Sequence, residues 1–142
     1  MKLGRSIDEF RVGMKAEFSH TFTQKETELM ADLIGDHNLF HYDGEFIRNT
    51  HFKKPIVHGL LVAGMSCHFG GDIFPGPGCL AETMIFKYLK PVYFGDTIKA
   101  IAEITMVDRE NRRLNFSMKC YNKKDEKFLE GEVTGLMFQV IV

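Results

Sequence analysis

The sequence predicts an α+β fold in which one buried helix packs against an antiparallel sheet. Two observations carry this prediction. Residues 57–73, VHGLLVAGMSCHFGGDI, have no charge before Asp72 and contain several small side chains, a composition that favours a helix buried on most sides. From residue 79 to the end, apolar and polar residues alternate with a period of two, which is the pattern of half-buried strands.

The elements before the buried helix are expected to be a strand, a helix and a long loop. Residues 14–23, MKAEFSHTFT, alternate apolar and polar side chains and predict the strand. Thr23 is a candidate N-cap for the helix, and Glu26 completes a capping box. Gly35 ends the helical pattern. Residues 36–57 are polar and irregular, with one short helix expected around residues 44–48.

Four long strands are expected in the second half, over residues 79–96, 97–111, 112–126 and 127–142. The turn segments FGDT, DRENR and NKKDE separate them and are short enough for antiparallel hairpins. Pro91 cannot donate to a ladder, so it requires an edge position or a bulge. No repeat, linker or low-complexity tract divides the chain, and we expect residues 1–142 to form a single domain.

Composition excludes several classes of protein. The 18 Lys and Arg balance 19 Asp and Glu, so no polybasic signal favours nucleic acid or an anionic membrane. No stretch approaches the roughly 20 apolar residues of a membrane span. The three cysteines have no CxxC spacing, and MKLGRSIDEF lacks the apolar run of a signal peptide. We therefore expect a cytoplasmic protein with neither a nucleic-acid nor a membrane partner.

The segment GDHNLFH, residues 35–41, concentrates groups that can move protons. Asp36 and His41 would lie in a loop after a helix end, where a carboxylate and an imidazole can hold a water and exchange protons with it. Asn38 could orient the acid or the water. A glycine followed by Asp and Asn is also a common helix stop, so a purely structural interpretation stays open.

His58 and Gly59 stand where the buried helix is expected to begin. Unpaired backbone N–H groups there favour a developing negative charge, which makes the Gly59 N–H a candidate oxyanion donor. The alternative is that His58 only caps the helix and Gly59 only permits close packing. His20, His51 and His68 have no metal-ligand spacing, and we expect no metal. Three lysines are candidates for contacts with phosphates, and the alternative is that they are simply solvated: Lys53, Lys54 and Lys90.

Taken together, these motifs resemble the MaoC-like (R)-specific enoyl-CoA hydratases, which have the hot dog fold. The resemblance rests on GDHNLFH (35–41), FKKPIVHGLLVAG (52–64), PGPG (75–78) and MIFKYLKPVYFGDTI (84–98), in the order of the family. It implies an antiparallel sheet wrapped around a long central helix, and a homodimer, with a higher assembly of dimers left open.

The resemblance also implies the chemistry and the residues that perform it. The catalytic pair falls on Asp36 and His41, the assisting amide on Asn38, and the contact to the thioester carbonyl on the backbone N–H of Gly59. The implied reaction is reversible syn hydration of a trans-2-enoyl-CoA to the (R)-3-hydroxyacyl-CoA. The substrate is thus an acyl-CoA thioester, and no cofactor is expected, because coenzyme A enters as part of the substrate.

Two departures from the family pattern and two rival functions remain. Leu39 stands where the signature has proline, which puts the rigidity of the loop in doubt. Gly64 stands where relatives often carry serine, which puts the acyl preference in doubt. The rivals are a hot dog acyl-CoA thioesterase and a non-catalytic acyl-binding subunit of a hydratase heteromer. Acyl chain length, pathway and the contacts of the coenzyme A nucleotide do not follow from the sequence.

Overall fold

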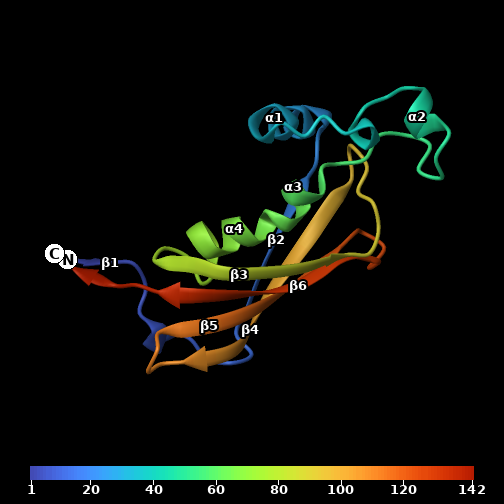
Figure 1. The fold of residues 1–142 in the computed structure, drawn as a ribbon. Helices are drawn as coiled ribbons and strands as arrows, with labels where there is room; N and C mark the ends of the chain where they lie inside the picture. The colour runs from blue at the N-terminus through green and yellow to red at the C-terminus, as the bar shows by residue number, and fades with distance from the viewer.

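The computed structural model describes residues 1–142 and contains a five-stranded antiparallel sheet with a helix across one face. The strand order is β2-β4-β5-β6-β3. Figure 1 shows the central helical segment lying across the sheet, with α1 and α2 beyond it and the two termini together at the opposite end. The strands are β2 Lys15–Thr21, β3 Cys79–Tyr88, β4 Thr97–Asp108, β5 Arg113–Tyr121 and β6 Lys127–Met137.

The helices occupy the segments that the sequence indicated. They are α1 Gln24–Ile34, α2 Glu45–Arg48, α3 Gly59–Ala63 and α4 Met65–His68, with a π-helical turn over Phe69–Ile73 and 3-10 turns at Ile7–Glu9 and Leu39–His41. Thr23 caps α1 in the expected capping box with Glu26, and Gly35 ends it with a left-handed φ of 77°. None of these helices has both the length and the apolar composition that crossing a membrane requires.

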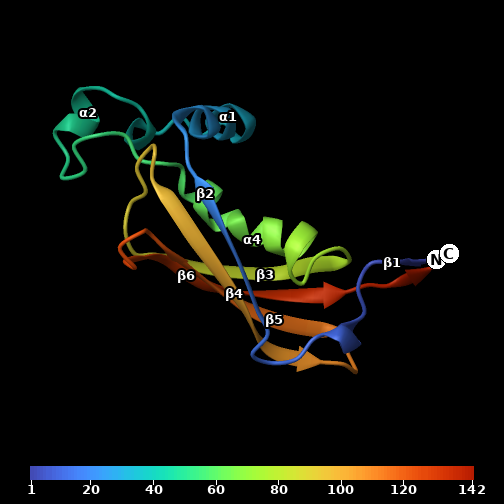
Figure 2. The ribbon, with the colours of Figure 1, turned by 180° about the vertical axis from the view of Figure 1, so that it is seen from behind.

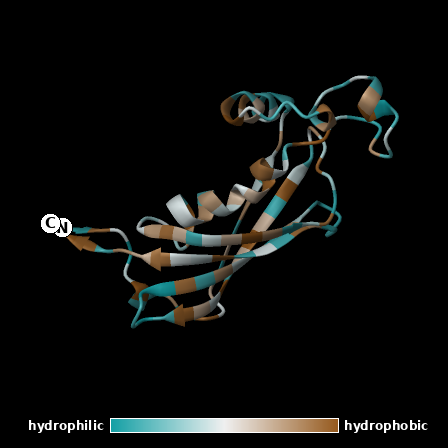
Figure 3. Ribbon diagram, in the orientation of Figure 1, coloured by the Kyte–Doolittle hydropathy of each residue, from teal (hydrophilic) through white to brown (hydrophobic).

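The core lies between the sheet and the central helix. In β4, residues Ile98, Ala100, Ala102 and Ile104 are fully buried and alternate with partly exposed neighbours. Figure 3 shows the corresponding alternation of hydrophobic and hydrophilic bands along the strands. The buried cluster joins these side chains to Val62, Ala63, Met65 and Phe69 of the helical segment and to alternate residues of β5. The α+β prediction is therefore confirmed.

The expected hairpin between the first two long strands is wrong. β3 pairs with β6 at one edge of the sheet, whereas β4 pairs with β2 and β5. After Tyr88 the chain leaves the sheet, and residues 91–93 run beside the segment before the central helix through a bond from Val57 N–H to the Val92 carbonyl. Pro91 thus lies outside any strand, where it needs no ladder hydrogen bond. Figure 2, the view from behind, shows β2 lying against β4, its antiparallel partner at the edge of the sheet.

Two further details differ from expectation. The last strand ends at Met137, and Val140–Ile141 (β7) instead pairs with Lys2–Leu3 (β1) in a separate two-stranded ribbon. The long helix is interrupted at Gly64, where a Cβ would lie 2.8 Å from the Leu60 carbonyl oxygen. Glycine therefore lets the helix tighten at this point.

Gly131 of β6 should be essential for packing, because a Cβ there would collide with the Ile85 carbonyl oxygen and the Phe86 ring of β3. We expect Gly131→Ala to lower the free energy of unfolding by about 1–3 kcal/mol, the usual cost of overpacking. Gly44→Ala is the matched control, since nothing lies within 4 Å of its Cβ position. Urea unfolding of both variants measures this, and equal stabilities would refute the packing argument.

Candidate active site

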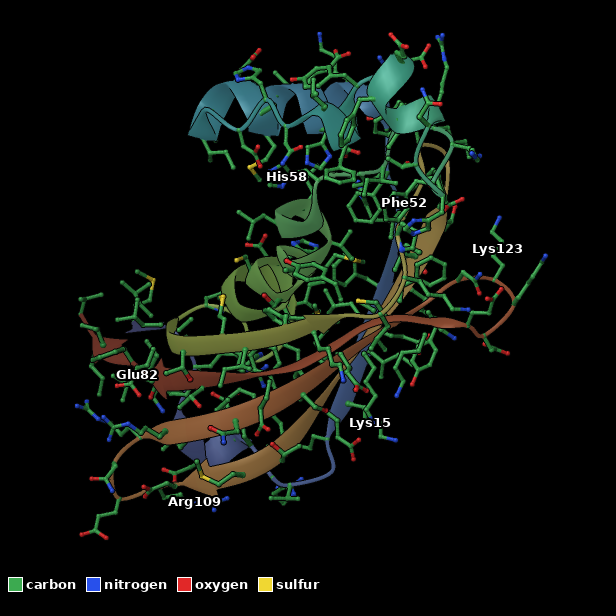
Figure 4. The ribbon with its side chains drawn as sticks, turned by 45° about the vertical axis from the view of Figure 1, so that its right-hand side comes forward. Lys15, Phe52, His58, Glu82, Arg109 and Lys123 are labelled. Atoms are coloured by element: carbon green, nitrogen blue, oxygen red, sulfur yellow. The ribbon has the colours of Figure 1, made fainter.

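Three side chains from separate segments meet beside the start of α3. Asp36, His41 and His58 each offer one ligand atom, and these atoms all lie within 4.8 Å of one another. Figure 4 places His58 between α1 and the first turn of the central helix. The loop after α1 brings the acid, a 3-10 turn brings His41, and the N-cap of α3 brings His58.

Asp36 is held by two donors, one for each carboxylate oxygen. The Asn38 backbone N–H donates to Oδ1 at 3.1 Å, and His58 Nε2 lies 2.7 Å from Oδ2. The hydrogen bond from His58 and then that from Asn38 lower the pKa of the Asp36 carboxyl. The acid therefore stays ionised and keeps free lone pairs for a further donor such as water.

His58 is 6 % exposed and is fixed at three of its atoms. Its backbone N–H donates to the Thr27 hydroxyl of α1 at 3.1 Å. Its Nδ1 accepts the Leu60 N–H at 3.2 Å and so caps α3. Because Nδ1 is an acceptor there, the neutral ring carries its proton on Nε2, which donates to Asp36. His58 is thus both the helix cap and the donor that orients the acid.

His41 has the opposite tautomer. Its Nδ1 lies 2.9 Å from the Ile56 carbonyl oxygen, which can only accept, so Nδ1 carries the proton and the neutral ring keeps a lone pair on Nε2. The ring stacks on His58 with centroids 4.8 Å apart. No direct hydrogen bond joins His41 to Asp36. The two groups are therefore neighbours, each held by a different partner and each able to bind a shared water.

A largely apolar cavity of about 420 Å³ opens beside this cluster. His41 and Gly59 both line it, and its remaining wall comes from the loop before α3, Val62 of α3, the end of β3 at Tyr88 with the segment after it, and Phe128. Gly59 is the first residue of α3, and its N–H has no acceptor in the protein. The cavity thus presents an imidazole and an unpaired backbone donor to any apolar ligand that enters it.

Comparison with known proteins identifies the family. The model of the MaoC like domain matches residues 9–127. This chain belongs to the MaoC-like family. It is 30% identical over 131 residues to an (R)-specific enoyl-CoA hydratase of Rhodospirillum rubrum, covering 92% of this chain and 90% of that one. It is 35% identical over 107 residues to the enzyme of the same description from Aeromonas caviae, covering 75% and 79%.

A solved structure agrees with this assignment. The (R)-hydratase from A. caviae involved in PHA biosynthesis superimposes with a TM-score of 0.85 at 28% identity, covering 91% of this chain and 98% of that one. The predicted family and its hot dog architecture are therefore confirmed. In this structure α3 and α4 form the central helix of the hot dog fold, and the five-stranded sheet wraps around that helix.

The cluster of this MaoC-like chain has the donor types of a two-histidine, one-carboxylate metal site. The hydrogen bonds oppose that interpretation. Coordination through His58 Nε2 would move the ring proton to Nδ1, which already faces the Leu60 N–H, so two donors would oppose each other. His41 could offer only Nε2, because Nδ1 is bound to the Ile56 carbonyl. The arrangement therefore suits protons and water better than a cation.

Sequence reasoning placed the segments correctly but missed several partners. Asn38 acts on Asp36 through its backbone, while its side chain accepts the Phe40 N–H and caps the 3-10 turn. The structural interpretations of the Gly35 stop and the His58 cap are both correct as local descriptions. The bond from His58 to Asp36 and the role of Thr27 were not anticipated, since tautomer and register are not visible in a motif.

The lysines considered as phosphate contacts interact with other groups of the protein. Lys90 lines the cavity but pairs with Glu126, and Lys54 lies over the Tyr93 ring at 4.6 Å. The Lys53 ammonium donates to the Arg48 carbonyl at 3.4 Å. All three ammonium groups therefore have protein partners, and the structure assigns no phosphate to them.

Removing the His58 imidazole should remove one of the two hydrogen bonds that hold the Asp36 carboxylate. We expect His58→Ala to raise the pKa of the Asp36 carboxyl toward its ordinary value, because its first donor is lost. Carboxyl ¹³C titration by NMR measures this. Asp43, whose pKa is lowered by Arg48, is an internal control that should not move. An unchanged Asp36 titration would show that His58 does not hold the acid.

The sign of the accompanying effect on stability follows from linkage. With a lowered pKa in the folded state, Asp36 contributes stability at pH above its unfolded value of about 3.9, and loses it as pH falls through the folded value. In the His58→Ala variant the pKa of the Asp36 carboxyl is less depressed, so this contribution to stability should be smaller.

Proposed function

We propose that this chain is an (R)-specific enoyl-CoA hydratase, which adds water reversibly and syn to a trans-2-enoyl-CoA to give the (R)-3-hydroxyacyl-CoA. The observation that carries the proposal is the meeting of an ionised Asp36 with the free His41 lone pair at a cavity that also exposes the Gly59 N–H. The named relatives support the same reaction.

The geometry suits a single bound water. A water making two hydrogen bonds of about 2.8 Å at a tetrahedral angle joins atoms roughly 4.5–5 Å apart. A ring nitrogen of His41 and a carboxylate oxygen of Asp36 lie within 4.8 Å of each other. The water can therefore donate one hydrogen bond to each, leaving its oxygen lone pairs directed at the substrate.

The reaction then proceeds without a covalent enzyme intermediate. The water oxygen bonds to C3 while His41 Nε2 takes one of its protons, and the electron pair of the C2–C3 double bond moves toward the thioester oxygen. Asp36 accepts a hydrogen bond from the second O–H of the water, which stays on the product hydroxyl, and its charge stabilises the imidazolium. The Gly59 N–H donates to the oxygen as charge develops. His41 returns the proton to C2 on the same face, which makes the addition syn.

Hydration of crotonyl-CoA tests the proposal directly. We expect loss of the enoyl thioester absorbance with the wild type, an (R)-3-hydroxy product by chiral analysis, and a kcat lower by roughly 10²–10⁴-fold for Asp36→Asn and for His41→Ala. Asp43→Asn and His37→Ala are matched controls, since both are exposed residues of the same loop that lie outside the cluster. Full activity in the Asp36→Asn and His41→Ala variants would refute the assignment.

The thioesterase alternative is separated in the same assay. An acid and an oxyanion donor would also serve a water that attacks the thioester carbonyl. That reaction releases free coenzyme A thiol from a saturated acyl-CoA, whereas hydration of an enoyl-CoA releases none. A non-catalytic acyl-binding subunit would show neither reaction when purified alone.

We also propose that the chain forms a homodimer through β3. This strand pairs with β6 on one side and has no partner strand on the other. Leu80, Met84 and Ile85 of β3 are all exposed, which is an unusually apolar edge. A second copy would extend the sheet and cover these side chains.

Oligomeric state can be tested with a charge on the exposed edge. We expect the wild type to have the mass of a dimer by light scattering, and Ile85→Glu to shift it toward the monomer at low micromolar concentration. Val12→Glu is the control, because Val12 is equally apolar and exposed but lies outside β3. A monomeric wild type, or a variant that stays fully dimeric, would contradict dimerisation through this strand.

Two other expectations belong to this proposal. The reaction moves no electrons to or from the protein, so no cofactor is needed beyond the coenzyme A that the substrate carries. A cytoplasmic location is supported by the three cysteines, all of which are free thiols.

A further inference from the structure

Tyr88 packs against Gly59, the proposed oxyanion donor, at the wall of the cavity. It is the last residue of β3, and its ring lies against Gly59 of α3. A Cβ at Gly59 would lie 3.0 Å from Cε1, 3.2 Å from Cζ and 3.4 Å from the hydroxyl oxygen of Tyr88. The absence of a side chain at Gly59 therefore leaves room for the Tyr88 ring, and both residues line the same cavity.

The Tyr88 hydroxyl has no hydrogen-bond partner in the protein, unlike that of Tyr93, which donates to the Phe52 carbonyl. The Gly59 N–H beside it is also unpaired. Desolvation by the surrounding side chains raises the pKa of Tyr88, so the phenol keeps its proton and remains a donor. Two free donors thus lie side by side at one wall of an apolar cavity.

We propose that the Tyr88 hydroxyl is a second hydrogen-bond donor to the thioester oxygen, completing an oxyanion hole with the Gly59 N–H. This inference rests on the proposed hydratase function. An amide nitrogen lies about 2.5 Å from its own Cβ position, which puts the hydroxyl within about 6 Å of the Gly59 nitrogen. One oxygen that accepts two hydrogen bonds of about 2.9 Å at an angle near 120° joins donors about 5 Å apart, a separation that this limit allows.

The donor acts without transferring its proton. As the water oxygen bonds to C3, the electron pair of the double bond moves through C2 to the thioester oxygen, and both donors stabilise the resulting enolate. When C2 takes the proton from His41, the carbonyl reforms and the Tyr88 O–H is unchanged. The phenol therefore binds more tightly to the transition state than to the substrate, and its contribution should appear in kcat.

Tyr88→Phe isolates the hydroxyl, because the ring and its contact with Gly59 are retained. We expect kcat for crotonyl-CoA hydration to fall roughly 10- to 100-fold, the value of one hydrogen bond to a developing charge, with KM nearly unchanged. Tyr121→Phe is the matched control, since its hydroxyl also has no partner and lies outside the cavity. It should leave both constants at wild-type values.

A spectroscopic measurement separates this role from a structural one. A conjugated aryl enoyl thioester, bound to the Asp36→Asn variant so that it does not turn over, absorbs at longer wavelength when its carbonyl is polarised. Adding Tyr88→Phe to that variant should reduce the red shift, and adding Tyr121→Phe should not. Equal thermal midpoints for the Tyr88→Phe variant and the wild type verify that the fold is intact.

The possible results distinguish the inference from the function on which it rests. Wild-type kcat and an undiminished red shift in the Tyr88→Phe variants would overturn the role of Tyr88, while a hydratase that depends on Asp36 would stand. A rise in KM with kcat unchanged would make Tyr88 a general binding contact and would also overturn its role. No hydration by the wild type would overturn the proposed function itself, and the inference with it.

Discussion

The hydrogen bond from His58 to Asp36 is the constraint on which the rest of the site depends. It joins the loop after α1 to the N-terminus of α3 across 22 residues of chain. His58 can make this bond only because the Leu60 N–H fixes its tautomer and the Thr27 hydroxyl fixes its backbone. The cap of a short helix, the packing of α1 and the orientation of the acid are therefore one arrangement, and disturbing any of them disturbs the other two.

The same logic assigns different tasks to two stacked histidines. Each has one nitrogen bound to a backbone group, but His58 faces an N–H and His41 faces a carbonyl. The neutral rings consequently present opposite groups to the acid, a donor on His58 and a lone pair on His41. A donor is suited to hold a carboxylate, whereas a lone pair is suited to take a proton from water. Backbone contacts alone thus distinguish the residue that holds the acid from the residue proposed as the base.

The sequence allowed much of this arrangement to be predicted. The capping box at Thr23, the stop at Gly35 and the alternation in β4 depend on local chemistry, and each was correctly placed. The strand order was not, because the choice between a hairpin and a crossover after Tyr88 depends on contacts of residues 91–93 with a distant segment. The meeting of Tyr88 with Gly59 is likewise a result of tertiary packing, which no spacing rule records.

Leu39 illustrates how the fold compensates for a missing local constraint. A proline there would restrict the loop, and such a restriction is usually worth about 0.4–1 kcal/mol through the unfolded state. In its absence the Asn38 side chain caps the turn, the Ile56 N–H donates to the Phe40 carbonyl, and His41 Nδ1 donates to the Ile56 carbonyl.

Each of these bonds contributes about 0.5–1.5 kcal/mol to stability, so together they outweigh the lost restriction. The bond from His41 Nδ1 also acts directly on the imidazole, which a proline two residues earlier would not. Despite the departure from the family signature, hydrogen bonds therefore fix the position of His41. The bonds to Ile56 come from the same segment that leads into α3, where His58 and Gly59 lie.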